Sequence, residues 1–238
     1  YIHAVSYVAN AKILIEPFGM LEVRNSAGSE FWKFAAEPIS RIEYQHQAVF
    51  YYNVSGTIAF GTSIITYFPG VAANVIPVFR VNASVAVGSG TTTTLNGLLE
   101  ISAGRTLTFQ NAGLKELRNG IAGSGIVVQD NTCGQIRING STSILGGGAL
   151  TLSTNGLAIE AGVCTLVSDK VINSGAVTVG NGATLNAQQY SLTNVAAASF
   201  ILSAGATLIT AHANGVNGSI QLSGSTSFQD FANYSFTG

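Results

Sequence analysis

Apolar and polar side chains alternate along short stretches of the N-terminal third of the chain. In residues 21–25 (LEVRN) and 41–45 (RIEYQ), apolar residues alternate with polar ones. This period of two is typical of a β-strand with one buried and one solvated face. Further short runs of apolar, β-branched and aromatic residues predict strands at 11–17, 30–36, 49–60 and 63–68. The best helical candidate is 111–120 (NAGLKELRNG), which starts with Asn, ends with Gly and is long enough for about two turns.

From about residue 80 the pattern becomes repetitive. Four segments share an outline of a turn followed by a strand, and the last three begin at Glu160, Gly180 and Ser203, at nearly equal intervals. A second phrase recurs as INGSTSIL and LSGSTSF. The four segments are 102–109 (SAGRTLTF), 160–167 (EAGVCTLV), 180–187 (GNGATLNA) and 203–210 (SAGATLIT). A fixed interval of roughly 20 residues is the signature of a solenoid, in which one repeat cannot bury its apolar face alone.

One predicted coil spans residues 176–194. Val177 and Val179 alternate with small or hydroxyl residues, and Leu185 and Leu192 return the chain to the interior. The glycines at 180–182 suit a sharp corner, where a positive φ is costly for other residues. Parallel stacking of such coils places like residues above like residues, so charged side chains would repel each other. The chain is therefore predicted to be an all-β, parallel β-solenoid with coils of about 20–23 residues.

Two other architectures share part of this pattern. An antiparallel sandwich also has short alternating strands and glycine turns, but it does not require a recurring phrase. A propeller blade needs about 40–50 residues per repeat. The solenoid is favoured over both.

Charge is scarce and unevenly distributed. Only 9% of residues are charged, against roughly a quarter in an ordinary globular protein, and the formal net charge is -1. A nucleic-acid partner would call for a clustered basic face, and no run of apolar residues is long enough to span a membrane. Charged and aromatic residues gather in the first part of the chain. We therefore predict an irregular N-terminal β or cap segment at 1–49 and a solenoid at 50–238, in a fragment of a longer chain.

The two cysteines, Cys133 and Cys164, belong to no CxxC motif. Two interpretations remain open for them, a disulfide and a pair of buried thiols. Neither the cysteines nor the three histidines have the spacing of a zinc site, so no metal or cofactor is predicted.

The C-terminal phrases resemble segments of a known class of proteins. Residues 202–208 (LSAGATL), 211–220 (AHANGVNGSI) and 228–238 (FQDFANYSFTG) are similar to phrases in large, repetitive cell-surface proteins of Bacteroidetes, of the adhesin and gliding-motility type, which the type IX secretion system exports. Residues 55–70 and 79–109 are also similar to these proteins, so the resemblance covers about 50–238. It implies a secreted structural or adhesive region at the cell surface, without chemistry of its own.

Many β-helices are enzymes that act on polysaccharides, and these need converging carboxylates. The three aspartates, Asp130, Asp169 and Asp230, are isolated in sequence and adjoin turn-forming residues. On a strand, His46 and Glu43 would point to opposite faces, and His212 lies in a turn-like phrase. The threonine run at 88–97 lacks the regular repeat of an ice-binding face and is interpreted as a solvated strand edge. No catalytic residue is predicted.

The aromatic cluster near the N-terminus has two interpretations. Trp32, Tyr51 and Tyr52 belong to it. They could cap the open end of the solenoid, as terminal repeats must. They could instead stack on sugar rings, because flat aromatic faces suit them. Capping is favoured.

The expected function is a non-catalytic, extracellular stalk or adhesin module of a bacterial surface protein. Its expected partners are surface glycans, other surface proteins or the secretion machinery. The alternatives are a carbohydrate-active or carbohydrate-binding β-helix, which would need carboxylates clustered in space, and a segment of a phage or viral fibre, which would be trimeric.

Overall fold

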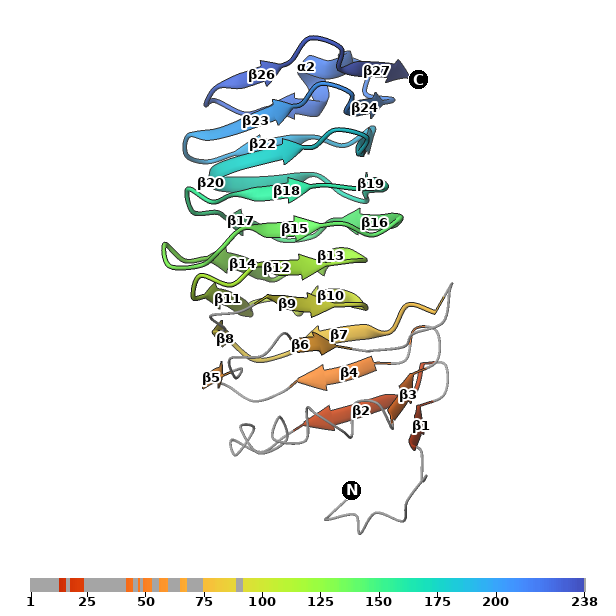
Figure 1. Ribbon diagram of the computed structural model, residues 1–238, viewed down its shortest axis with the longest axis vertical. Helices are drawn as coiled ribbons and strands as arrows, with labels where there is room; N and C mark the ends of the chain where they lie inside the picture. Colours follow the sequence, from red (N-terminus) through yellow and green to blue (C-terminus); the bar gives the residue numbers. More distant parts are fainter. Residues whose placement is uncertain are drawn as a thin grey trace.

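The computed structural model describes residues 13–15, 18–23, 42–44, 47, 49–52, 56–59, 65–67, 75–88 and 92–237. In this part of the chain, parallel strands wind into successive coils and form a β-solenoid, as predicted. Figure 1 shows the coils stacked from β2 near one end of the molecule to β27 at the other. The solenoid has three faces, each made of parallel strands that pair between neighbouring coils.

The first face contains ten described strands in unbroken order. They are β2 (Met20–Val23), β4 (Val49–Tyr52), β7 (Val78–Val81), β10 (Leu98–Ile101), β13 (Gly120–Gly123), β16 (Thr142–Leu145), β19 (Val163–Leu166), β21 (Thr184–Gln188), β24 (Thr207–Thr210) and β27 (Asn233–Phe236). Strand β2 lies within the predicted N-terminal segment and pairs with β4. The boundary between residues 49 and 50 stays a prediction.

The second and third faces meet in one long strand, β20 (Lys170–Val179), whose two halves pair with different neighbours. The second face also contains β5 (Gly56–Ala59), β8 (Val85–Gly88), β11 (Thr106–Gln110), β14 (Ile126–Gln129), β17 (Leu150–Thr151), β22 (Leu192–Asn194) and β25 (Ile220–Gln221). The third contains β6 (Ile65–Tyr67), β9 (Thr93–Leu95), β12 (Lys115–Leu117), β15 (Ile136–Ile138), β18 (Leu157–Ile159), β23 (Ala198–Leu202) and β26 (Thr226–Phe228). Among the described elements, three lie outside these faces: the paired strands β1 (Ile13–Ile15) and β3 (Ile42–Tyr44), and the short helix α2 (Gly215–Ser219).

The length of each coil follows from the residues that pair on the first face. Thr142 pairs with Val163 and Val163 with Thr184, so two successive coils are equal in length and fall within the predicted range. Thr184 pairs with Thr207, which makes the following coil slightly longer but still as predicted. The predicted period is thus confirmed here. The first described coils, from Met20 to Val49 and from Val49 to Val78, and the last coil, from Thr207 to Asn233, are longer than predicted.

The recurring segments do not all occupy the same face. Those at 160–167, 180–187 and 203–210 stack in register in β19, β21 and β24. The segment at 102–109 instead forms β11 on the second face. The two copies of the second phrase likewise fall on different faces, in β16 and β26.

The core is a continuous apolar column inside the three faces. Val177, Val179, Leu185 and Leu192 are fully buried in it, as their spacing predicted. Their small or hydroxyl neighbours are the more exposed residues of the same strands, for example Thr178 in β20. One side of each strand therefore fills the interior, and the other side faces outward.

Gly182 and Gly205 occupy the same corner in successive coils, just before the first-face strands β21 and β24. Gly182 and Gly205 have φ of 75° and 73°, values that disfavour a side chain with a Cβ. The Gly182 amide donates to the Gly205 carbonyl at 3.2 Å, so this corner is hydrogen bonded from coil to coil. The corners predicted from glycine-rich turns are confirmed at these positions.

The structure contradicts the predicted helix and answers the question that the sequence left open about the two cysteines. Residues 111–120 form no helix, because Lys115–Leu117 are strand β12, paired with β9 and β15. Both cysteines are free and buried, Cys164 within β19 and Cys133 just before β15. The structure therefore contains two buried thiols and no disulfide between them.

Candidate functional site

An outward row of side chains crosses the first face near its N-terminal end. Tyr51, Arg80 and Glu100 are register partners on β4, β7 and β10. The neighbours Val81 and Ile101 are fully buried, so strand alternation turns Arg80 and Glu100 outward. Tyr51 is partly exposed. These three residues are called the Tyr51 row.

The Arg80 guanidinium and the Glu100 carboxylate form a two-point ion pair. Arg80 Nε donates to Oε1 at 2.8 Å, and Nη2 donates to Oε2 at 3.1 Å. Their side chains are 34% and 27% exposed, so both stay accessible to a ligand. A fixed guanidinium beside an aromatic ring offers hydrogen-bond donors and a stacking surface together.

A second charged row lies on the third face. Thr94, Glu116 and Arg137 are register partners on β9, β12 and β15. The Thr94 hydroxyl donates to Glu116 Oε2 at 2.9 Å, and Arg137 Nε lies 3.1 Å from Glu160 Oε1. Each of these contacts joins one coil to the next, so they tie coils together.

Lys115 and Lys170 are buried at strand positions that face the interior, where an apolar side chain is expected. Lys170 Nζ donates to the carbonyls of Gly146, at 2.8 Å, and Gly148, both in the preceding coil. Burial lowers the pKa of Lys170 to about 7. Lys115 Nζ donates to the Gly113 carbonyl, and burial lowers its pKa also. Both side chains hold a corner of the solenoid from inside.

Gln129 holds another corner in the same way. Its Nε2 donates to the carbonyls of Gly134 at 2.8 Å and Gly156 at 3.1 Å, and its Oε1 accepts from the Ser153 amide at 2.9 Å. The side chain is 2% exposed. It therefore bonds its own coil and the next one simultaneously.

The buried thiols are in surroundings that suppress ionisation. Burial raises the pKa of Cys133 to about 11, although the nearby Lys115 opposes this shift. Burial also raises the pKa of Cys164 to about 11. A thiol is nucleophilic as the thiolate, so neither cysteine is arranged for nucleophilic chemistry.

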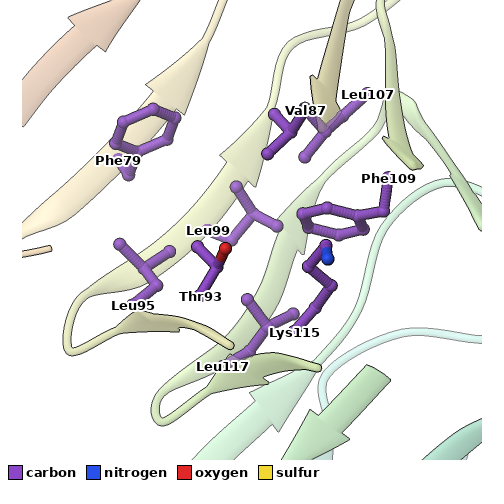
Figure 2. Close-up of a pocket in the computed structure, with 9 residues that line it drawn as sticks. All are labelled: Phe79, Val87, Thr93, Leu95, Leu99, Leu107, Phe109, Lys115 and Leu117. Atoms are coloured by element: carbon purple, nitrogen blue, oxygen red, sulfur yellow. The ribbon is translucent and has the colours of Figure 1, made fainter. Parts of the chain in front are cut away.

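A pocket of about 30 Å³ lies inside the coils that contain β7 to β12 (Figure 2). Its polar lining residues are Thr93 and Lys115, and the Thr93 hydroxyl has no hydrogen-bond partner. The volume suits one or two water molecules, since one water needs roughly 10–15 Å³. The remaining lining residues are Phe79, Val87, Leu95, Leu99, Leu107, Phe109 and Leu117.

The predicted threonine edge is wrong in this region. Thr93 and Thr94 are each 6% exposed, because β9 pairs with β6 on one side and β12 on the other. They are part of the packed wall of the solenoid.

Two of the three aspartates accept hydrogen bonds at turns or corners of the solenoid. Asp130 Oδ1 accepts from the amide and hydroxyl of Thr132, at 2.8 and 2.7 Å. Asp169 Oδ1 accepts from the Ser191 amide in the next coil at 2.9 Å. Asp230 is exposed in the last coil. His212 Nδ1 accepts from the Asn214 amide at 3.0 Å, which agrees with the predicted turn.

The predicted aromatic residues are placed to different extents. Tyr51 lies in β4 in the Tyr51 row, and Tyr52 follows it, paired with Val81 in the backbone ladder. Trp32 and His46 lie outside the described residues. The Tyr51 row was not found as a unit from sequence, because its members are far apart along the chain and meet only through the coil period.

Comparison of the chain with protein-family models, curated proteins and solved structures gives no significant match. No helix among the described residues is long and apolar enough to cross a membrane. Within the same residues, no three His, Cys, Asp or Glu side chains gather as a metal site. The class that the described fold defines is the parallel β-solenoid.

Proposed function

We propose that this chain is a non-catalytic structural segment of a bacterial cell-surface protein, acting outside the cell as a stiff stalk or adhesin module. The observation that carries the proposal is the unbroken parallel ladder of the first face, from β2 to β27. Such a column gains about 4.8 Å in length per coil, so it separates what lies at its two ends.

The polar side chains support the same function. Arg80, Glu116, Arg137 and Asp169 each contact a residue of a neighbouring coil. Buried Lys170 likewise bonds the coil before it. These groups reinforce stacking, which suits a part that transmits length and stiffness.

The resemblance to repetitive Bacteroidetes surface proteins supports export and surface location, with type IX secretion and gliding motility as the expected setting. The proposal predicts that antibodies against 92–237 label intact cells of the source organism. Labelling that requires broken cells would contradict the surface location.

Deleting one whole coil tests the stalk. Removal of 163–183 joins Gly162 to Thr184, and Thr184 occupies the next register position after Val163. Because each coil contacts mainly its neighbours, the shortened chain should fold and lose about 4.8 Å of length in small-angle scattering.

The matched control deletes half a coil, residues 173–183. This shift would bring strands of different faces into register, so cooperative unfolding should be lost. A whole-coil deletion that unfolds like the half-coil deletion would contradict a modular stalk.

Carbohydrate binding is the second candidate, and the Tyr51 row favours it. Tyr51 would stack on a sugar ring while Arg80 and Glu100 bond its hydroxyls. A Tyr51→Ala variant should lose binding to surface polysaccharide in a glycan array, whereas Tyr51→Phe should keep most of it. Equal binding by the wild type and Tyr51→Ala would reject this site.

A further inference from the structure

One inward column of side chains on the third face changes character along the solenoid. Thr93 and Lys115, which are register partners on β9 and β12, occupy this column in two successive coils. In the four coils that follow, the same column is apolar and almost completely buried. Its members there are Ile136, Leu157, Val177 and Phe200. The column is therefore polar at two adjacent levels and apolar at the next four.

The pocket of about 30 Å³ lies at these two polar levels. All three faces line it, through β7 and β10 of the first face, β8 and β11 of the second, and β9 and β12 of the third (Figure 2). Each of these strands is paired on both sides. The pocket is thus enclosed by the ladders of the solenoid and lies where its apolar column is interrupted.

The Thr93 hydroxyl is the group that points to a ligand. Thr93 is 6% exposed, and within the described part of the chain its Oγ1 has no hydrogen-bond partner. Figure 2 shows this oxygen turned toward the inside of the ring of lining side chains. A buried, unpaired hydroxyl costs stability, and native proteins keep few of them. Valine has the same shape and would continue the apolar column without this cost.

Water alone is a poor occupant of the pocket. A buried water typically makes about three hydrogen bonds. The polar side chains of the lining are Thr93 and Lys115, and Lys115 Nζ already donates to the Gly113 carbonyl. A water at Thr93 would face mainly apolar carbon. A ligand with an apolar body would therefore displace it favourably.

The volume and the burial restrict the ligand. One water needs roughly 10–15 Å³, so the pocket has room for about two waters. Covalently bonded atoms lie closer together than waters do, so the same room admits a chain of about three heavy atoms. Burial lowers the pKa of Lys115, and a charged ligand would face the same desolvation penalty. The ligand that fits is small, neutral and mostly apolar.

We propose that this pocket binds a short-chain alcohol, whose hydroxyl bonds Thr93 and whose carbon chain contacts Leu99, Leu107 and Phe109. The binding free energy of even the best small ligands is limited per heavy atom, so about three atoms allow a dissociation constant of about 1 mM at the tightest. The site goes beyond the stalk function and does not depend on it. Deletion of 163–183 leaves both coils of the pocket intact, so failure of one proposal is separable from failure of the other.

Methyl NMR of the full chain tests the proposal, with ethanol as the probe from about 1 to 100 mM. The methyl signals of Val87, Leu99 and Leu107, which line the pocket, should shift in a saturable way with a dissociation constant of about 1–10 mM. They should also show NOE contacts to the ethanol methyl group. The signals of Leu185 and Leu208, which are buried in distant coils, should not change.

Thr93→Val keeps the shape of the side chain and removes the hydroxyl. It should weaken ethanol binding about fivefold, because one hydrogen bond is lost. Xenon fills apolar cavities without hydrogen bonds, so its effect on the same methyl signals should be equal in the wild type and Thr93→Val. Thr94→Val, a matched change at a residue that does not line the pocket, should leave ethanol binding unchanged.

Three results would overturn the proposal. The first is a set of pocket methyl signals that does not shift, or shifts without saturation. The second is NOE contacts from these methyl groups to water alone in the presence of ethanol. The third is equal ethanol affinity in the wild type and Thr93→Val.

Discussion

Gly205 lies directly below Phe231 in one corner column, and its amide donates to the Phe231 carbonyl at 3.0 Å. Both residues have positive φ, 73° and 65°. The corner therefore imposes a left-handed conformation whatever residue occupies it. Glycine meets this requirement without strain, and phenylalanine meets it at a cost of about 1–2 kcal/mol.

The first prediction concerns Gly205→Ala. A Cβ at this position would combine a positive φ with a contact of 2.7 Å to Asn181 Oδ1. The variant should lose about 1–2 kcal/mol in free energy of unfolding, measured by urea denaturation. Because the Asn181 side chain is able to turn aside, most of the loss should come from the backbone.

Gly180→Ala is the matched control for this corner. Its nearest heavy atom would be the Ile159 carbonyl oxygen at 3.4 Å, and its φ is not in the left-handed region. It should change stability by less than about 0.5 kcal/mol. Equal losses in both variants would contradict the role of the positive φ at Gly205.

The coil period and the core could be predicted from sequence because both are local. Residues 160–167, 180–187 and 203–210 each supply a glycine corner followed by a strand, and their spacing is within one residue of the coil length. The face assignment of 102–109 could not be predicted in the same way. Every corner needs a similar turn, so one motif serves the corners of different faces.

The site residues were harder to predict because the coil period brings together residues that are far apart in sequence. Lys115 stands between Asn and Gly signals that suggest a short helix, yet pairing with two neighbouring coils makes it part of a strand. A buried lysine is rare, so its sequence context gave no reason to place it inside. Tertiary pairing overrides the local signal in this case.

The second prediction concerns pH. The folded-state pKa of Lys170 is about 7, below its ordinary value of 10.5, so the unfolded chain binds more protons between these values. Stability should therefore increase as pH rises above 7, by about 2 kcal/mol between pH 6.5 and 8.5. Lys170→Met should remove this increase, as measured by urea denaturation across the range.

Lys115 should also make the free energy of unfolding increase with pH, because burial lowers its pKa as well. The contribution of Lys170 is thus the difference between the wild type and Lys170→Met in how steeply the free energy of unfolding changes with pH. Arg105→Met removes an exposed cation and should leave the slope unchanged. Parallel curves for the wild type and Lys170→Met would show that Lys170 titrates normally in the folded chain.

The third prediction concerns Gln129→Leu. The variant would leave the Ser153 amide and the carbonyls of Gly134 and Gly156 without this buried partner. It should lose about 2–4 kcal/mol in free energy of unfolding. Gln110→Leu, on the outward side of β11, should change stability by less than about 0.5 kcal/mol.

The fourth prediction compares two adjacent threonines in β9. The Thr93 hydroxyl is buried without a hydrogen-bond partner, whereas the Thr94 hydroxyl donates to Glu116 Oε2 at 2.9 Å. Thr93→Val should stabilise the protein by about 1 kcal/mol, because it removes an unpaired polar group and keeps the shape. Thr94→Val should destabilise it by about 1 kcal/mol or more, since it breaks a bond to a charged acceptor. Thermal unfolding of both variants provides the measurement, and a destabilised Thr93→Val would mean that water in the pocket satisfies the hydroxyl.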